Sequence, residues 1–301
     1  MQCRPVLKSP TIRCCSLAFS SAAVLSANGF QLPWSSYPLN NTLSQALDPF
    51  PQYAQGFGGT TNGGHSTYNA LEAGLQHNFS HGLYAQASYT FSKFLSDTTS
   101  ENVYWRNREK AINGADRPHV VTLSYIYDLP VGHGKAFGAN MHPVLDAFIG
   151  GWKVSAVQHY QSGAVLSISC GQNMYGAGAA RCNYVAGQAV YNPSWNPSDP
   201  RSSYLNLAAW TQPANGVYGN AGAVIPSLRQ PIQMDEDVAL SKIFKITERK
   251  SLEFRGSAFN IANRHLLGGL TTSITSSTFG QFTNPQSNQP RNVEGSLRFK
   301  W

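Results

Sequence analysis

The chain has 301 residues, and only 12% of them are charged, about half the share that is usual in soluble domains. It carries 22 Lys and Arg against 15 Asp and Glu, but the basic residues are scattered, so a phosphate-tracking surface and a nucleic-acid partner are not expected. No stretch reaches the roughly 18 apolar residues that a membrane-spanning helix needs. Low charge without such a stretch favours a β-barrel, and many Gly, Pro, Asn and Ser residues indicate strands joined by turns and polar loops.

The start of the chain, residues 1–29, has an ambiguous pattern. Arg4, Lys8 and Arg13 precede the moderately apolar sequence CCSLAFSSAAVLSA, in the order of a signal peptide's basic and apolar regions. Serines dilute that run, so an artefact of a truncated or wrongly assigned gene start is the other interpretation. We therefore expect an uncertain start segment at 1–29 and one β region over residues 30–301.

From Ser66 onward the apolar residues recur with period two, which predicts β-strands. The alternation is clearest in LYAQASYTFSK, where leucine, alanine, tyrosine and phenylalanine alternate with polar residues. The short sequence SHG joins this strand to the one before it, which predicts a hairpin. The seven predicted strands are Thr67–Phe79, Leu83–Lys93, His119–Leu129, Trp152–Ser169, Gln233–Phe244, Ser251–Ile261 and Arg291–Trp301.

The connections between these strands alternate in length. Those after the first, third and fifth strands are the shorter ones, and those after the second, fourth and sixth are longer and polar. This is typical of outer-membrane barrels, which have short periplasmic turns and long external loops. Pro130–Gly151 is long for a turn, and Cys170–Pro231 is predicted to be an external loop region. The predicted fold is all-β, an antiparallel up-and-down meander that forms part of a transmembrane barrel.

Two of the five cysteines, Cys170 and Cys182, lie in that loop region. The small loop between them predicts a disulfide, with a Cα separation of roughly 4.4–6.8 Å. Such a bond would indicate an oxidising, extracytoplasmic setting. Two unrelated thiols are the alternative, and none of the cysteines has the spacing of a zinc site.

The last strand alternates Val293, Leu297, Phe299 and Trp301 with charged and polar residues. A terminal strand that ends in an aromatic residue resembles the signal by which barrel-insertion machinery recognises outer-membrane proteins. We predict that Phe299 and Trp301 carry this signal. An ordinary lipid-facing strand has the same pattern and remains the alternative.

Four blocks occur in order within residues 30–301: STYNALEAGLQHNFSHGLYAQASYTFSKFLSD, DRPHVVTLSYIYDLPVGHGKAFG, IGGWKVSAVQHYQSGAVLSIS and LEFRGSAFNIANRHLLGG. This region resembles the C-terminal barrel of TonB-dependent receptors of the Oar-like type, which bear a carboxypeptidase-regulatory domain. The resemblance implies the outer membrane of a Gram-negative bacterium and a barrel of roughly 22 strands with an N-terminal plug. It also implies uptake of a scarce ligand, driven by TonB.

The chain departs from that pattern because it lacks a plug domain and an early TonB-contact segment. We therefore expect a fragment, on which TonB acts only through a missing N-terminal part. Seven strands are not expected to close a barrel, so we expect this polypeptide alone to transport nothing without upstream strands or further copies. The alternative function is a soluble β-sandwich that binds carbohydrate or another partner.

Catalytic and metal-binding patterns are not found. The eight histidines occur without an HExxH motif, and no serine lies in a G-x-S-x-G turn, so we predict no enzyme activity, no metal and no cofactor. The acidic run Asp235–Asp237 is either a ligand site or a solvated rim. Arg249, Lys250, Arg255 and Arg264 are expected to face the lumen or the membrane interface. We expect that three aromatic residues of the external loops can contact a ligand: Trp195, Trp210 and Tyr218.

Overall fold

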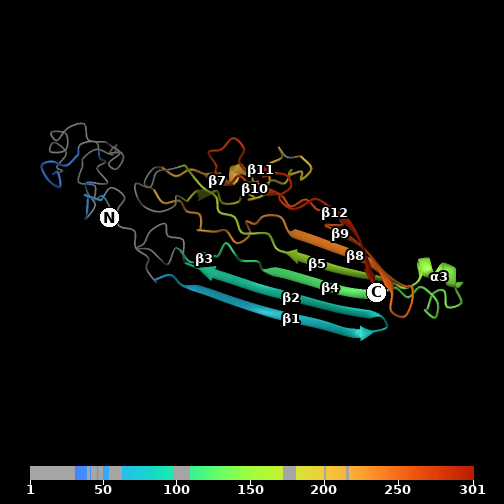
Figure 1. The fold of residues 1–301 in the computed structure, drawn as a ribbon. Coiled ribbons are helices and arrows are strands. Elements are labelled where there is room, and N and C mark those ends of the chain that lie inside the picture. Colours follow the sequence, from blue (N-terminus) through green and yellow to red (C-terminus); the bar gives the residue numbers. More distant parts are fainter. Residues whose placement is uncertain are drawn as a thin grey trace.

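The protein's computed structural model describes residues 31–38, 41, 46, 50–53, 63–97, 109–171, 181–199, 201–214 and 217–301. The predicted start segment, residues 1–29, lies outside these ranges. Seven long strands form one antiparallel sheet in which order in space follows order in sequence (Figure 1). They are β1 (Ser66–Ser80), β2 (Leu83–Ser96), β4 (His119–Asp128), β5 (Trp152–Gln161), β8 (Gln233–Lys245), β9 (Ser251–Phe259) and β12 (Asn292–Lys300). A short strand, β3 (Ala111–Ile112), also pairs with β2.

The predicted meander is thus confirmed, but β5 and β9 end two or more residues earlier than expected. β5 ends at Gln161 rather than Ser169, because the chain then leaves the sheet and pairs with residues 228–230, where the Ala164 carbonyl accepts from the Gln230 N–H and the Leu166 N–H donates to the Leu228 carbonyl. β9 ends at Phe259 because Asn260 has a φ of 48°, a left-handed conformation that asparagine tolerates and a strand does not. The alternative of a β-sandwich is wrong, since the long strands form one sheet rather than two packed sheets.

The register gives this sheet two different faces, because residues that pair across neighbouring strands point to the same side. The apolar face carries, strand by strand, Leu71, Phe91, Leu123, Val154, Leu240, Phe254 and Leu297. The polar face carries Glu72, Thr90, Thr122, His159, Asp235, Ser257 and Glu294.

The apolar face is uncovered over the outer strands. Leu75 on β1 is 72% exposed and Leu297 on β12 is 69% exposed. Exposed apolar area on this scale is unfavourable in water, so the face fits a lipid environment. Among the described residues, no strand pairs with the outer edge of β1 or of β12.

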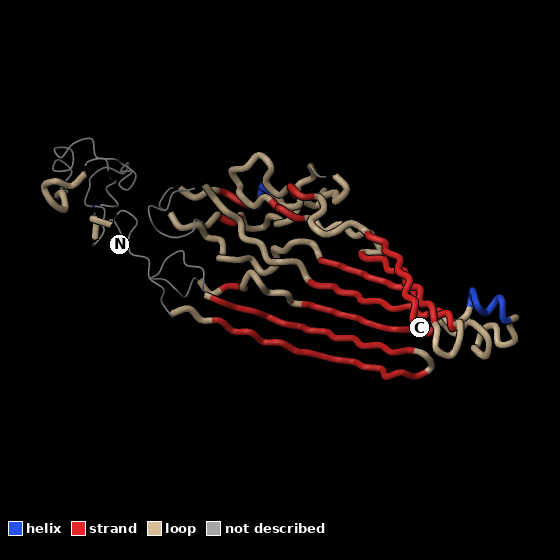
Figure 2. Tube along the Cα trace, viewed as in Figure 1, coloured by secondary structure: helices blue, strands red, loops and turns tan. Residues whose placement is uncertain are grey.

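The two longest connections between the seven strands, β5–β8 and β9–β12, gather at one end of the sheet and contain the buried core (Figure 2). We call the described parts of residues 162–232 and 260–291 the external lobe. Its core includes Leu205, Trp210, Leu228 and Phe279. Its regular elements are the pair β6 (Asn183–Tyr184) and β7 (Trp210–Thr211), the pair β10 (Gly268–Leu270) and β11 (Phe282–Asn284), and a 3₁₀ turn at Leu207–Ala209. The sequence did not predict these short elements, which have too few residues for a period.

The opposite end of the sheet has two short turns and the longer connection between β4 and β5, which contains one helix, α3 (Pro143–Ile149). That connection, residues 129–151, is about as long as the one between β2 and β4, so the predicted alternation of connection lengths is wrong at this place. This helix was not predicted. It begins with Pro143, whose missing N–H is not needed there, after a His142 ring that accepts a hydrogen bond from the Val144 N–H. Within the described residues, no helix is long and apolar enough to cross a membrane.

Candidate membrane-facing surface and external cavity

Aromatic residues lie near both ends of the apolar face. Tyr89, Phe91 and Tyr160 lie toward the external lobe, and a larger group lies toward the short turns. In that group the Trp152 and Phe254 rings meet edge to face, with centroids 5.9 Å apart. Aromatic girdles at two levels are typical of strands that cross a membrane. The group near the short turns is Tyr125, Tyr127, Trp152, Phe244, Phe254, Phe299 and Trp301.

The predicted assembly residues Phe299 and Trp301 therefore belong to this second girdle. Their rings stack with centroids 6.1 Å apart, and Trp301 is exposed. Both the assembly signal and the ordinary lipid-facing strand remain compatible with this position.

Glu236 on β8 points to the apolar face, and its charge is compensated. The Arg264 guanidinium donates from Nε and from Nη2 to its two carboxylate oxygens, at 3.2 and 3.1 Å. The Tyr160 hydroxyl donates to the same carboxylate at 3.3 Å. Because a charge in a low-dielectric setting must be paired, Arg264 and Tyr160 allow Glu236 to lie at this edge of the membrane surface.

Lys242, also on the apolar face of β8, is buried at the opposite end. Its ammonium group donates to the backbone carbonyls of Asp146, at 3.2 Å, and of Gly150. The Trp152 and Phe244 rings lie beside it, with centroids 5.7 and 5.0 Å from Nζ. The connection that contains α3 thus covers this cation on the membrane side of the sheet.

On the polar face, near the external lobe, the ends of β5, β8 and β9 border a cavity of about 540 Å³. Its lining includes the carboxylates of Asp235 and Asp237, the His159 ring, the Phe259 ring and several amide side chains. The acidic run is therefore divided, because Glu236 points to the opposite face. Two carboxylates, amides and an aromatic ring around one cavity can bind a polar, neutral or cationic ligand.

Asn260 fixes the loop that closes one side of this cavity. Its amide donates to the carbonyls of Arg264 and Gln289, both at 3.0 Å, and its oxygen accepts from the Arg264 N–H at 2.7 Å. Its own N–H donates to Asp237 Oδ1 at 2.8 Å. One buried asparagine thus joins the ends of β8 and β9 to two loops. Sequence reasoning missed it, because asparagines in turns are common.

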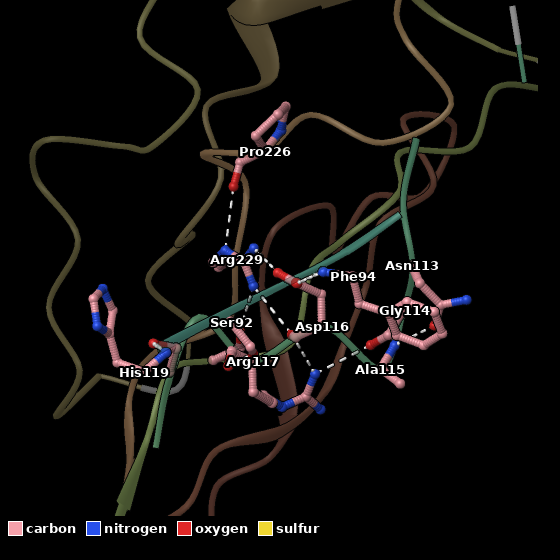
Figure 3. Close-up of polar contacts among 12 residues, drawn as sticks. Ser92, Phe94, Asn113, Gly114, Ala115, Asp116, Arg117, His119, Pro226 and Arg229 are labelled. Atoms are coloured by element: carbon pink, nitrogen blue, oxygen red, sulfur yellow. Dashed lines mark hydrogen bonds and ion pairs between the residues drawn. The ribbon is translucent and has the colours of Figure 1, made fainter. Parts of the chain in front are cut away.

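An ion pair joins the sheet to the external lobe (Figure 3). Asp116 is 1% exposed, and its carboxylate accepts hydrogen bonds from Arg229 Nη2 at 2.5 Å and from the Phe94 N–H on β2 at 2.6 Å. Arg229 also donates to the carbonyls of Asp116, Gly163 and Pro226, each at 3.2 Å. The turn before β4, the strand β2 and the lobe are therefore held at one point, which we call the Asp116–Arg229 clamp.

Two tyrosines hold the backbone of Arg229. The Tyr204 hydroxyl donates to the Arg229 carbonyl at 2.8 Å, and the Tyr191 oxygen accepts from the Arg229 N–H at 2.7 Å. Burial raises the pKa of the Tyr204 phenol, and the neighbouring Tyr191 raises it further. Tyr204 therefore stays protonated and acts as a donor across the physiological pH range.

The predicted cysteine pair also lies in the lobe. Cys170 and Cys182 form a disulfide with a Cα separation of 5.4 Å. Next to Cys182, Arg181 makes a buried ion pair with Glu109 at 2.5 Å, which is a second link between the lobe and the connection that precedes β4.

The remaining sequence-predicted residues have diverse positions. Trp210 was offered as a ligand contact, and this is wrong because its ring is buried in the lobe core. Trp195 packs against Tyr204, with centroids 4.8 Å apart.

In the part of the chain that the structure describes, no group of three or more His, Cys, Asp or Glu side chains is arranged to hold a metal ion. Arg255 lies on the polar face, and Arg249 and Lys250 lie in or beside the β8–β9 turn.

A single curved sheet with a lipid-compatible face, two aromatic girdles and a polar opposite face is the wall of a transmembrane β-barrel. The family model described as "Outer membrane beta barrel domain" matches residues 22–294, so the chain belongs to that family and lies in the outer membrane. No match was found among curated proteins or among solved structures.

Proposed function

We propose that this chain forms part of the wall of a TonB-dependent uptake barrel and that the cavity on its polar face contacts the ligand. The cavity carries this proposal, because it lies on the polar face, the face that would line the interior of a barrel, at the end where the longest loops gather. The four sequence blocks that resemble TonB-dependent receptors support the link to TonB. The proposed role is binding and passage, without catalysis and without a cofactor.

The open sheet supports a further part of this proposal. Backbone N–H and C=O groups cannot remain unpaired in hydrocarbon, since each unsatisfied group costs several kcal/mol. The outer edges of β1 and β12 therefore need partner strands in the membrane. We propose that these come from upstream strands of a longer polypeptide or from further copies of the chain, and that TonB acts through a plug in the complete protein.

Depletion of compounds from the growth medium, followed by mass spectrometry, tests uptake and identifies the ligand in the same experiment. The strains are the parent bacterium, a deletion of this gene, a deletion of TonB, and the gene deletion complemented with Asp235→Asn/Asp237→Asn. We expect at least one compound whose depletion requires both the gene and TonB, and severalfold slower depletion in the double variant. Asn keeps a hydrogen-bond acceptor for the Asn260 N–H, so the loop is retained.

The matched control for this experiment is Glu253→Gln, a change of the same kind on the polar face at the other end of the sheet. It is expected to leave depletion unchanged. Depletion that continues without TonB, or no compound that depends on the gene, would contradict the proposal. If the control and the cavity variant slow depletion equally, the proposal that the cavity contacts the ligand is contradicted.

We also propose that barrel-insertion machinery recognises Phe299 and Trp301. Replacing the last strand of an unrelated outer-membrane barrel with residues 291–301 tests this directly. Rescue of heat-modifiable electrophoretic mobility is expected, with a clear loss for Trp301→Ser and little change for Lys300→Ser on the opposite face. Equal rescue by Trp301→Ser would support an ordinary lipid-facing strand instead.

A further inference from the structure

The helix α3 exposes an apolar surface that the wall of the barrel does not explain. Val144, Leu145, Phe148 and Ile149 lie on one side of it, and α3 buries none of its side chains. Val144 is 63% exposed and Phe148 is 70% exposed. Phe137, in the preceding loop, is also exposed. We call the four helix residues the α3 patch.

The orientation of the patch is fixed from the opposite side of the helix. Asp146 points away from the patch, and its Oδ1 accepts a hydrogen bond from the His133 N–H at 2.6 Å. Gly132 and Gly150 pack against this carboxylate, and a Cβ atom built on Gly150 would overlap it. The loop can approach so closely only because both positions are glycine. With Asp146 held against the loop, the apolar side of α3 must point outward.

The sheet then determines which surroundings the patch meets. The Trp152 indole N–H donates to the Phe148 carbonyl at 2.8 Å, and Lys242 donates to the Asp146 and Gly150 carbonyls. Both Trp152 and Lys242 belong to the apolar face. The C-terminal end of the helix therefore lies on the membrane side of the sheet, beside the aromatic girdle near the short turns, and the helix extends past the ends of the strands (Figure 1).

We propose that α3 is an interfacial helix whose patch inserts into the phospholipid leaflet on the periplasmic side. The patch continues the lipid-facing surface through Trp152, and its position beside an aromatic girdle is where the hydrocarbon gives way to headgroups. A short helix with one apolar side and one anchored polar side can lie in this boundary, parallel to the membrane plane. The proposal rests on the outer-membrane location and does not depend on TonB-dependent uptake.

Spin labels on single cysteines test the proposal in isolated outer membranes. The background is the full chain with Cys3, Cys14 and Cys15 changed to Ser and the Cys170–Cys182 disulfide retained. Labels are placed by Phe148→Cys in the patch and by Ala147→Cys, which is exposed on the other side of the same helix. Collisions with oxygen report lipid, and collisions with a water-soluble nickel chelate report water. We expect the oxygen-to-nickel ratio to be severalfold higher at Phe148 than at Ala147.

Leu297→Cys on the lipid-facing wall provides the reference for an inserted sheet, and its ratio should also be high. Equal, water-like ratios at Phe148 and Ala147 would overturn the proposal, as would protection of Phe148 from both reagents, which would indicate a protein partner. A water-like ratio at Leu297 would overturn the orientation of the sheet and the proposal with it. Failure of TonB-dependent uptake would leave all three ratios unchanged, so the two proposals fail separately.

Discussion

The wall and the external lobe are built by opposite means from one chain. In the wall, hydrogen bonds between long strands hold the backbone, and large apolar side chains such as Leu75 and Leu297 stay exposed. In the lobe, strands are two or three residues long, and a buried core around Leu205 and Leu228 is reinforced by a disulfide and two buried ion pairs. The apolar side chains of the wall contact lipid, whereas those of the lobe, which lies in water, are buried in a core of their own.

This difference teaches where each region is sensitive to mutation. The effect of a substitution in the wall depends on the side of the sheet on which the residue lies, because one side meets lipid and the other meets the polar interior. The effect of a substitution in the lobe depends on the residues that lose a partner, because water cannot compensate a buried charge or fill a buried cavity there. Three single-site experiments separate these two kinds of sensitivity.

The largest effect is expected for Asp116→Asn at the clamp. It leaves Arg229 without its counter-charge at a nearly buried position, and breaking such a pair costs about 3–5 kcal/mol. Limited proteolysis of intact outer membranes should then cleave the lobe much faster, while heat-modifiable mobility of the wall is retained. The control, Glu248→Gln in the exposed β8–β9 turn, should change neither. If the wall and the lobe lose stability together, the clamp joins them into one cooperative unit and the contrast fails.

A smaller effect is expected for Leu123→Arg, in the middle of β4 on the apolar face. Arginine on the lipid side near the midplane costs about 2–4 kcal/mol, so the fraction of correctly assembled protein and its urea midpoint should fall. Ser124→Arg places the same side chain on the polar face of the same strand and should have little effect. Similar losses for both variants would mean that the two faces of the sheet do not meet different environments.

The smallest effect is expected for removal of the disulfide by Cys170→Ser/Cys182→Ser. A bridge that closes a loop of 12 residues contributes about 2–3 kcal/mol, mainly by restricting the unfolded chain. Hydrogen exchange should become faster in the lobe and remain slow in β4, β5 and β8. Faster exchange in those strands would show that the wall depends on the lobe for its stability.

The sequence predicted the wall well because its strands are long and exposed to two different environments. Each has enough residues for period two to appear, as in β2, and hairpin turns such as Ser80–Leu83 have recognisable residues. The lobe was poorly predicted because its elements are too short to have a period. Trp210 illustrates the error, since an aromatic residue in a loop was taken for a ligand contact and is instead part of a core. The helix α3 was missed because Gly and Pro around it indicate a turn.

The sequence by itself determined the order and direction of the strands, the two faces of the wall and the class of protein, because alternation and connection length are local properties of the chain. Only the tertiary structure decided which distant residues meet. Asp116 and Arg229 lie 113 residues apart, and the acidic residues 235–237 divide between a cavity and the lipid side. The direction of the α3 patch likewise depends on a carboxylate held by a loop and on two side chains from the sheet. Such contacts produce no periodic pattern in the sequence, because they join segments that are far apart along the chain and meet only in the folded structure.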